Sequence, residues 1–214
     1  AYGGTGVYRP ALGTWQMTVD KPFKTSHYTM NLFSTPKGIM VWAEGFFGGF
    51  NVETMHYEKW PIEGTFKRYL GPDASGAVWD TKRDLMWIIS RTGWRSTDGK
   101  LCTYDPETHK MTTMTPTNAD ALGQKATYLR ELVYHPGSDL ILTLNFDKAT
   151  NRQLAYDIAA NQWVRLNIEK VGRVGSPMAM VYDTKRDLIW CLTGGRLIYA
   201  LKLDPAALKR DPGG

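Results

Sequence analysis

The chain has 214 residues, of which 43% are hydrophobic, 12% aromatic and 22% charged, and its net charge is +5. This composition excludes a disordered chain, and no apolar run reaches the roughly 20 residues that a membrane helix requires. The N-terminal AYGGTGVYRP lacks the basic start and apolar core of a secretory signal. We therefore expect one soluble domain without membrane insertion, cytoplasmic or assembled into a particle.

The distribution of charge bears on possible partners, and the cysteines bear on disulfide bonding. The basic residues are spread along the chain without a cluster, which argues against nucleic acid as a partner. Cys102 and Cys191 lie in separate apolar runs, KLCTY and LIWCLT. These runs predict buried free thiols and no disulfide framework.

The chain opens with a strand and a first hairpin. The segment TWQMTV, residues 14–19, has the apolar and aromatic content of a strand. In NLFSTPKGIMVW, two apolar runs flank a turn with Pro and Gly, and Phe33 precedes Ile39 by six residues. Two short runs joined by such a turn predict a β-hairpin.

A repeated segment indicates that this hairpin recurs. AVWDTKRDLMWI, from Ala77 to Ile88, and MVYDTKRDLIWC, from Met180 to Cys191, are identical at eight of twelve positions. The same six-residue frame also fits Tyr134 to Leu140, which makes four copies with that at Phe33. Such periodicity is typical of repeat architectures. We interpret the charged turns of the repeat as solubilising the strand ends rather than as docking sites.

A second hairpin follows each of the first ones. Tyr104 precedes Met111 by seven residues, and Tyr156 precedes Trp163 by the same number. The Asp-Pro after Tyr104 opens a turn, because Asp bonds the backbone ahead and Pro fixes φ. Two hairpins per unit give four strands. The four units span residues 22–67, 68–117, 124–168 and 174–204.

Four-stranded units with a diglycine, then Tyr, then Trp seven residues later resemble kelch-type β-propeller blades. Gly194 and Gly195 match the diglycine in the last unit, and Gly48 and Gly49 match it in the first, whereas the two middle units lack it. The resemblance covers nearly the whole chain. It implies an all-β fold, a single β-propeller domain of four-stranded antiparallel blades, and no particular function.

The ends of the chain bear on ring closure. The last unit has no apolar strand after Asp204, and the strand at 14–19 belongs to no unit. Pairing this strand with the last blade would close the ring and remove two exposed edges. We therefore expect four blades closed by the N-terminal strand. The alternative is a fragment of a larger propeller, in which VYRP would belong to an absent blade.

Propellers act mainly through the loops on one face. The segments predicted to form this face are 44–51, 90–100 and 145–153, with the interblade segments around Lys67, Lys125 and Arg173. Aromatic and Arg side chains dominate binding hot spots. The candidate binding residues are therefore Phe46, Phe47, Phe50, Arg91, Trp94 and Arg95. The alternative is that the phenylalanines cover the core and Trp94 covers a neighbouring blade.

Catalytic and metal-binding signatures are missing from the sequence. It contains no HExxH, GxSxG, Walker loop or CxxC pair, so we expect no catalytic residue, no metal and no cofactor. His109 and His135 fall in predicted turns and are expected to be solvated. By elimination, the carboxylates that could serve a propeller glycosidase or lyase are Asp20, Glu44, Glu131 and Asp147.

The sequence thus favours a non-enzymatic scaffold for protein–protein interaction. One variant is a structural subunit of a larger assembly, since short propeller proteins occur in phage particles and a phage or bacterial origin fits. A lectin-like propeller is an alternative, with Trp60, Trp94 or the phenylalanines stacking on sugar rings. A propeller glycosidase or lyase is another.

Overall fold

The computed structural model describes residues 6–17, 30–36, 38–43, 46–63, 76–90, 100–118, 132–146, 150, 152–169, 177–193 and 197–213. Every regular element in these ranges is a β-strand. Over the same residues, no helix is present that could cross a membrane.

The strands form four main antiparallel sheets, which we number in chain order. The first sheet contains β3 (Met30–Thr35), β4 (Gly38–Ala43), β5 (Phe46–Asn51) and β6 (His56–Lys59). The second contains β7 (Gly76–Asp80), β8 (Leu85–Ser90), β9 (Lys100–Asp105) and β10 (Lys110–Thr113). The third contains β11 (Leu132–His135), β12 (Leu140–Phe146), β13 (Arg152–Asp157), β14 (Gln162–Glu169) and β18 (Arg210–Asp211). The fourth contains β15 (Pro177–Asp183), β16 (Leu188–Thr193) and β17 (Ile198–Leu201).

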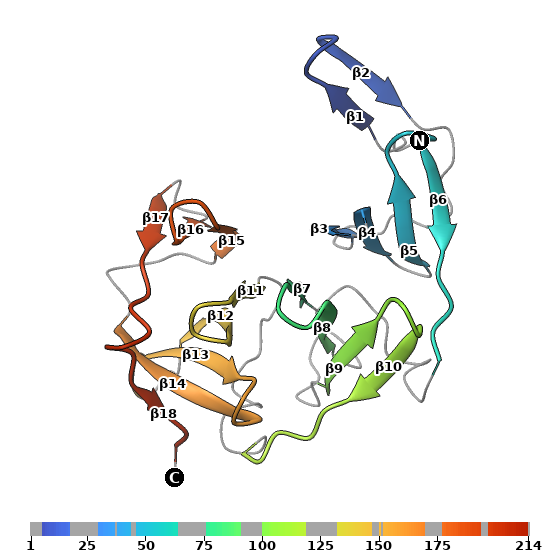
Figure 1. Cartoon of the computed structure of the whole chain (residues 1–214). Coiled ribbons are helices and arrows are strands. Elements are labelled where there is room, and N and C mark those ends of the chain that lie inside the picture. Colours follow the sequence, from blue (N-terminus) through green and yellow to red (C-terminus); the bar gives the residue numbers. More distant parts are fainter. Residues whose placement is uncertain are drawn as a thin grey trace.

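The sheets follow one another around a centre, as Figure 1 shows. The first strand of each sheet lies innermost: β7 lies beside β3 and β11, and β11 lies beside β15. Within each sheet the chain then runs outward by antiparallel hairpins. The prediction of an all-β, four-bladed propeller is confirmed.

The prediction that the N-terminal strand completes the last blade is wrong in this structure. The strand is β2 (Thr14–Met17), and it pairs with β1 (Gly6–Arg9) in a separate hairpin. The fourth sheet has three strands among the described residues. The chain after Asp204 instead turns back, and β18 pairs with the outer strand β14 of the third sheet. Arg210 holds it there, because its guanidinium lies 2.7 Å from the Asp157 carboxylate.

A recurring turn explains why these hairpins form. The last residue of a strand is often Asp, and its carboxylate accepts hydrogen bonds from backbone N–H groups two and three residues ahead. Asp80 does so from Lys82 and Arg83, at 2.9 and 3.2 Å. Asp183, its copy in the repeat, does so from Lys185 and Arg186. This is the local bonding that makes Asp favourable in turns.

The last residue of each such turn has a positive φ, which L-amino acids other than Gly adopt rarely. In four hairpins a tyrosine five residues earlier in the chain hydrogen-bonds the side chain of that residue. The pairs are Tyr104 with His109, Tyr134 with Asp139, Tyr156 with Asn161, and Tyr182 with Asp187. The tyrosine therefore stabilises a backbone conformation that the turn requires.

The core lies between adjacent sheets. Trp87, Ile89 and Leu101 of the second sheet pack against Tyr134, Tyr156 and other apolar residues of the third. Similar clusters join the first sheet to the second and the third to the fourth. Each sheet with a neighbour on both sides thus has two apolar faces, in contrast to the one-sided strands of an exposed sheet.

Candidate interaction surface

One face of the fourth sheet presents hydrophobic side chains to solvent. Trp190 lies directly opposite Val181 and Ala200 in the sheet, and Leu192 lies opposite Ile198, so these side chains share one face. Their exposed fractions are 60% for Val181, 38% for Trp190, 41% for Leu192 and 67% for Ile198. We call this set the fourth-sheet face. A contiguous apolar surface of this kind commonly marks an interaction site.

The second sheet carries the same face in a buried form. There Trp87 lies opposite Val78 and Thr103, and Ile89 lies opposite Leu101. Trp87, Ile89 and Leu101 are only 2 to 4% exposed, because the third sheet packs on them. The fourth-sheet face therefore has the composition of a surface between two blades.

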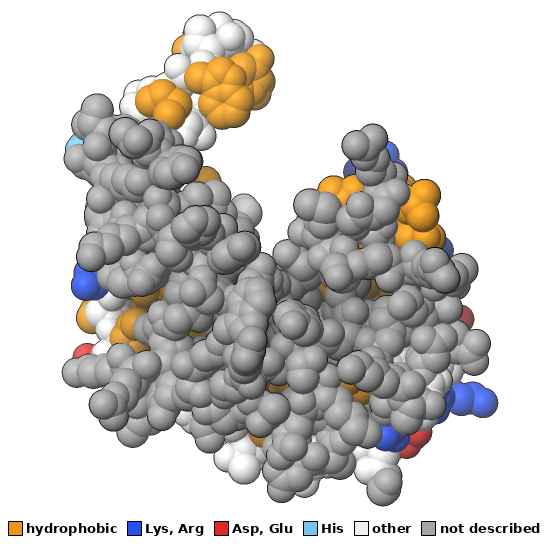
Figure 2. Space-filling model, turned by 180° about the vertical axis from the view of Figure 1, so that it is seen from behind, with side chains coloured by type: hydrophobic (Ala, Val, Ile, Leu, Met, Phe, Trp, Pro, Cys, Tyr) orange, Lys and Arg blue, Asp and Glu red, His pale blue; other side chains and the backbone are white. Residues whose placement is uncertain are grey.

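Exposed hydrophobic side chains gather at two separate places on the molecular surface. In Figure 2, hydrophobic side chains gather over the fourth sheet and again on the projecting hairpin β1–β2, on opposite sides of an indentation. Among the described residues, every large hydrophobic side chain with high exposure belongs to one of these two places.

Arg83 connects the second sheet to the third at the turn of the repeat. Its guanidinium donates to Asp80 of its own turn at 2.8 Å and to both carboxylate oxygens of Asp139 at 2.7 and 2.8 Å. These hydrogen bonds lower the pKa of Asp139. Arg186, the copy of Arg83, is 64% exposed and pairs with Asp183 of its own turn. The repeated turns are thus structural, and one of them also joins two blades.

His135 joins the third sheet to the fourth, and the expectation of a solvated turn residue is wrong for it. The residue is 1% exposed. Its Nδ1 accepts from the Ser138 backbone N–H at 3.0 Å, so Nε2 carries the hydrogen and donates to Asp187 at 3.1 Å. His109 is half-buried, with its Nδ1 2.9 Å from the Tyr104 hydroxyl.

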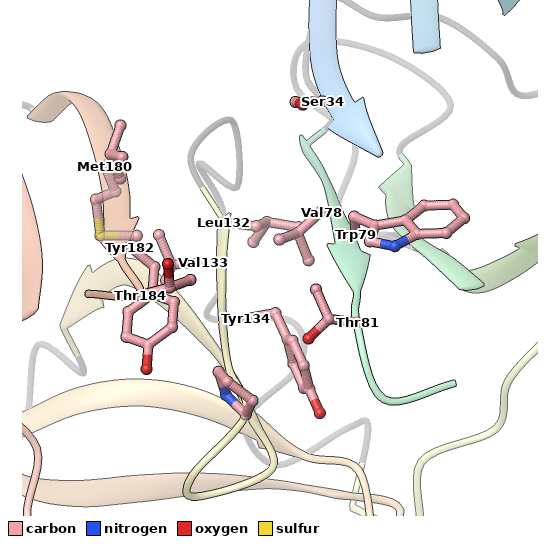
Figure 3. A pocket seen from close by; sticks show the side chains of 12 residues that line it. Ser34, Val78, Trp79, Thr81, Leu132, Val133, Tyr134, Met180, Tyr182 and Thr184 are labelled. Atoms are coloured by element: carbon pink, nitrogen blue, oxygen red, sulfur yellow. The ribbon is translucent and has the colours of Figure 1, made fainter. Parts of the chain in front are cut away.

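A pocket of about 280 Å³ lies at the centre, where the innermost strands meet. In Figure 3 side chains of β15 lie on one side of it and those of β7 on the other, with β11 between them. Apart from apolar residues, the described lining contains the hydroxyl-bearing residues Ser34, Thr81, Thr184, Tyr134 and Tyr182. Burial and a hydrogen bond to Asp187 raise the pKa of Tyr182 to about 12. The phenol therefore stays protonated at neutral pH.

The described residues hold no cluster of three or more His, Cys, Asp or Glu side chains that could bind a metal ion. The four carboxylates named above for glycosidase or lyase chemistry lie outside the described residues. Nothing in the described part of the chain therefore places two carboxylates on the central pocket.

Three of the predicted binding residues lie in a strand. Residues 46–51, predicted as part of a loop, form β5, so that prediction is wrong for them. Phe46, Phe47 and Phe50 are buried. The Phe47 ring packs edge-on against Tyr104, with ring centroids 4.5 Å apart, and Phe46 and Phe50 contact Tyr57. Their role in binding stays a prediction, and in this structure they contribute to the core.

The other three predicted binding residues, Arg91, Trp94 and Arg95, lie outside the described residues. Trp60, a predicted sugar-stacking residue, is parallel to Tyr104 with centroids 6.5 Å apart. It also lies against Gly49, where a side chain would come within 2.8 Å of its ring. One face of this indole is therefore covered from within the protein.

The sequence prediction missed Val181, Trp190, Leu192 and Ile198 as surface residues. The repeat contained the signal, because it aligned Trp190 with Trp87 and Val181 with Val78. It could not tell that the second copy lacks a packed neighbour, since this depends on where the next sheet lies.

Comparison with known proteins finds only remote similarities. No family model matches the chain, and no curated protein matches it. A solved structure of a nidogen/laminin complex is similar at 13% identity with a TM-score of 0.48, covering 85% of this chain and 60% of that one. An inactive virginiamycin B lyase from Staphylococcus aureus, with quinupristin, is similar at 12% identity with a TM-score of 0.44, covering 89% of this chain and 74% of that one. The designed Ika4 protein is similar at 10% identity, with a TM-score of 0.37 and coverage of 84% and 88%.

These similarities are too remote to transfer an activity or a partner, and the chain spans about 60% of the length of the nidogen/laminin chain that it matches. The sheets themselves define the class. The protein is a β-propeller-like protein with four antiparallel blades.

Proposed function

We propose that this protein is a non-enzymatic scaffold that binds a protein partner through the fourth-sheet face. The observation that carries the proposal is the difference in burial between equivalent side chains: Trp87 is 3% exposed, whereas Trp190 is 38% exposed. When another protein covers this apolar surface, the surface is removed from water, which favours binding. Trp is also among the residues enriched in binding hot spots.

The proposed setting is a larger assembly, such as a phage particle, in which the chain is a structural subunit. The apolar fourth-sheet face supports an assembled state, because large exposed apolar patches promote association. We also propose that the four units are kelch-type repeats. Tyr156 and Trp163, the pair that carried this resemblance, lie directly opposite each other in the third sheet. The loop residues Arg91, Trp94 and Arg95 remain a proposed second contact.

The test compares binding by the wild-type protein and a Val181→Lys, Ile198→Lys variant. The protein is isolated with its partner from its source, and affinity for that purified partner is measured by sedimentation. Placing two charges on the face should weaken binding at least 30-fold or so, the effect of losing about 2 kcal/mol. Leu12→Lys is the matched control, since Leu12 is 73% exposed and lies in the β1–β2 turn. Equal affinity of the double variant and wild type rejects the proposed surface.

A further inference from the structure

A pair of aromatic rings on β13 and β14 forms part of the cover on the equivalent face of the second sheet. Trp87 packs against Tyr156 of β13, with ring centroids 5.5 Å apart. Tyr156 in turn lies opposite Trp163 of β14, and these two centroids are also 5.5 Å apart. The natural complement of this Trp-centred face is thus a β-hairpin with Tyr opposite Trp.

The chain contains a second hairpin of that construction, β1–β2. Tyr8 lies opposite Trp15, and their ring centroids are 5.3 Å apart. Four residues join the two strands and the last, Gly13, has φ of 63°, as Asn161 has φ of 51° in the β13–β14 turn. The hairpin β1–β2 therefore repeats the geometry that covers Trp87.

This aromatic pair is not covered in the structure. Tyr8 is 48% exposed, Trp15 68% and Met17 56%, and Met17 shares their face because it lies opposite Gly6. A Tyr–Trp pair with this exposure leaves a large apolar area in water. The molecule thus has two exposed apolar surfaces, the fourth-sheet face and the aromatic face of the β1–β2 hairpin. The hairpin resembles the β13–β14 hairpin, which packs on the equivalent face of the second sheet.

We infer that the partner of the fourth-sheet face is the β1–β2 hairpin of a second copy of this chain, packed head to tail. The inference rests on the proposed function and names its occupant. Trp190 of one copy then packs on Tyr8 and Trp15 of the next, as Trp87 packs on Tyr156 and shares a core cluster with Trp163 within the chain. The interface is heterologous, so it generates a ring or a filament, depending on the rotation between copies.

The attachment of the hairpin favours a second copy over the fourth sheet of the same molecule. The opposite face of the hairpin is bound to the first sheet, because Val7 packs into the cluster of Val41, Phe46 and Phe50. Arg9 donates to the Val52 carbonyl, and its guanidinium lies 3.7 Å from Glu53. In Figure 1 the hairpin projects from the first sheet and lies well apart from β15–β17. A second copy can reach it without breaking these contacts.

The test is a complementation experiment with Trp15→Ser and Trp190→Ser, each made in the full chain. Both residues are exposed, so each variant is expected to fold, and circular dichroism with urea unfolding verifies this. Light scattering should show wild type above the monomer mass and each variant at the monomer mass. A mixture should form a heterodimer that grows no further, because only the Trp190→Ser hairpin and the Trp15→Ser face are intact. Leu12→Ser is the control and should assemble like wild type.

The other outcomes separate the two proposals. A wild-type protein that stays monomeric at every concentration, or variants that do not complement, overturn the head-to-tail inference. If Trp190→Ser weakens binding to a partner and Trp15→Ser does not, the fourth-sheet face stands and its occupant is another protein. If neither substitution changes any association, the inference and the proposed function fail together.

Discussion

The second and fourth sheets begin with nearly the same hairpin sequence but lie in different surroundings. In both, an Asp at the end of the first strand begins the turn and accepts a hydrogen bond from the Trp indole N–H, at 3.1 Å for Trp87 and 3.5 Å for Trp190. The second sheet lies between two neighbours, while the described part of the fourth has one. Local sequence therefore determines the hairpin, and the next sheet determines whether its second face is core or surface. The same substitution should have different consequences in the two copies.

The largest difference is expected for the tryptophans. Trp87→Ala should lower the free energy of unfolding by about 3–5 kcal/mol, since it leaves a cavity between two sheets. Trp190→Ala should change it by less than about 1 kcal/mol at a dilution where the protein is monomeric, because the side chain already contacts water. Urea unfolding followed by fluorescence measures both. Equal losses would mean that the fourth-sheet face is buried in the monomer.

The next difference concerns the arginines of the repeated turn. Arg83→Gln should cost about 1–3 kcal/mol, because it leaves the buried Asp80 carboxylate without its cation and removes the bridge to Asp139. Arg186→Gln removes an exposed pair within one turn and should leave the urea midpoint nearly unchanged. If the two variants unfold at the same urea midpoint, the ion pair between Arg83 and Asp139 contributes nothing to stability, and the two copies of the turn do not differ in their electrostatic contribution.

The smallest effect concerns how the free energy of unfolding changes as the pH falls. Hydrogen bonds from Arg83 lower the pKa of folded Asp139 below its unfolded value. Its contribution is therefore complete above the unfolded pKa, about 4, and is lost as the pH falls through the folded pKa. Asp139→Asn should be less stable than wild type at neutral pH and should approach it as the pH falls below about 4. Urea midpoints measured from pH 6 to pH 3, about the range that matters, check this, and parallel curves would contradict it.

The repeats allowed the fold to be predicted from the sequence. The repeat from Ala77 and the Tyr-to-Trp spacing predict hairpins by turn chemistry alone, because turns that begin with Asp are stabilised by local hydrogen bonds. The five-residue spacing from Tyr to the positive-φ residue, as in Tyr134 and Asp139, is also present in the sequence. It would have placed His109 and Asp187 in bonded positions rather than in solvent.

The rest depends on contacts between distant segments. Pairing of β18 with β14 rests on Arg210 reaching Asp157, which no local pattern reveals. The predicted loop between the second and third strands of the first unit includes residues 46–51, which form β5. The strand forms because Gly48 allows close approach: a side chain at this position would come within 1.9 Å of the Glu58 carbonyl oxygen. Exposure of Trp190 likewise depends on a neighbour that its own sequence does not specify.

The tyrosine bonds at the turns also bear on the order in which the chain folds. Each joins residues only five apart, so a hairpin can close with its turn already fixed, on the roughly 1–10 μs timescale of hairpin formation. The bridge from Arg83 to Asp139 spans 56 residues and must await two finished hairpins. We therefore expect assembly to proceed from independent hairpins to stacked sheets, with docking of preformed units slower than strand pairing.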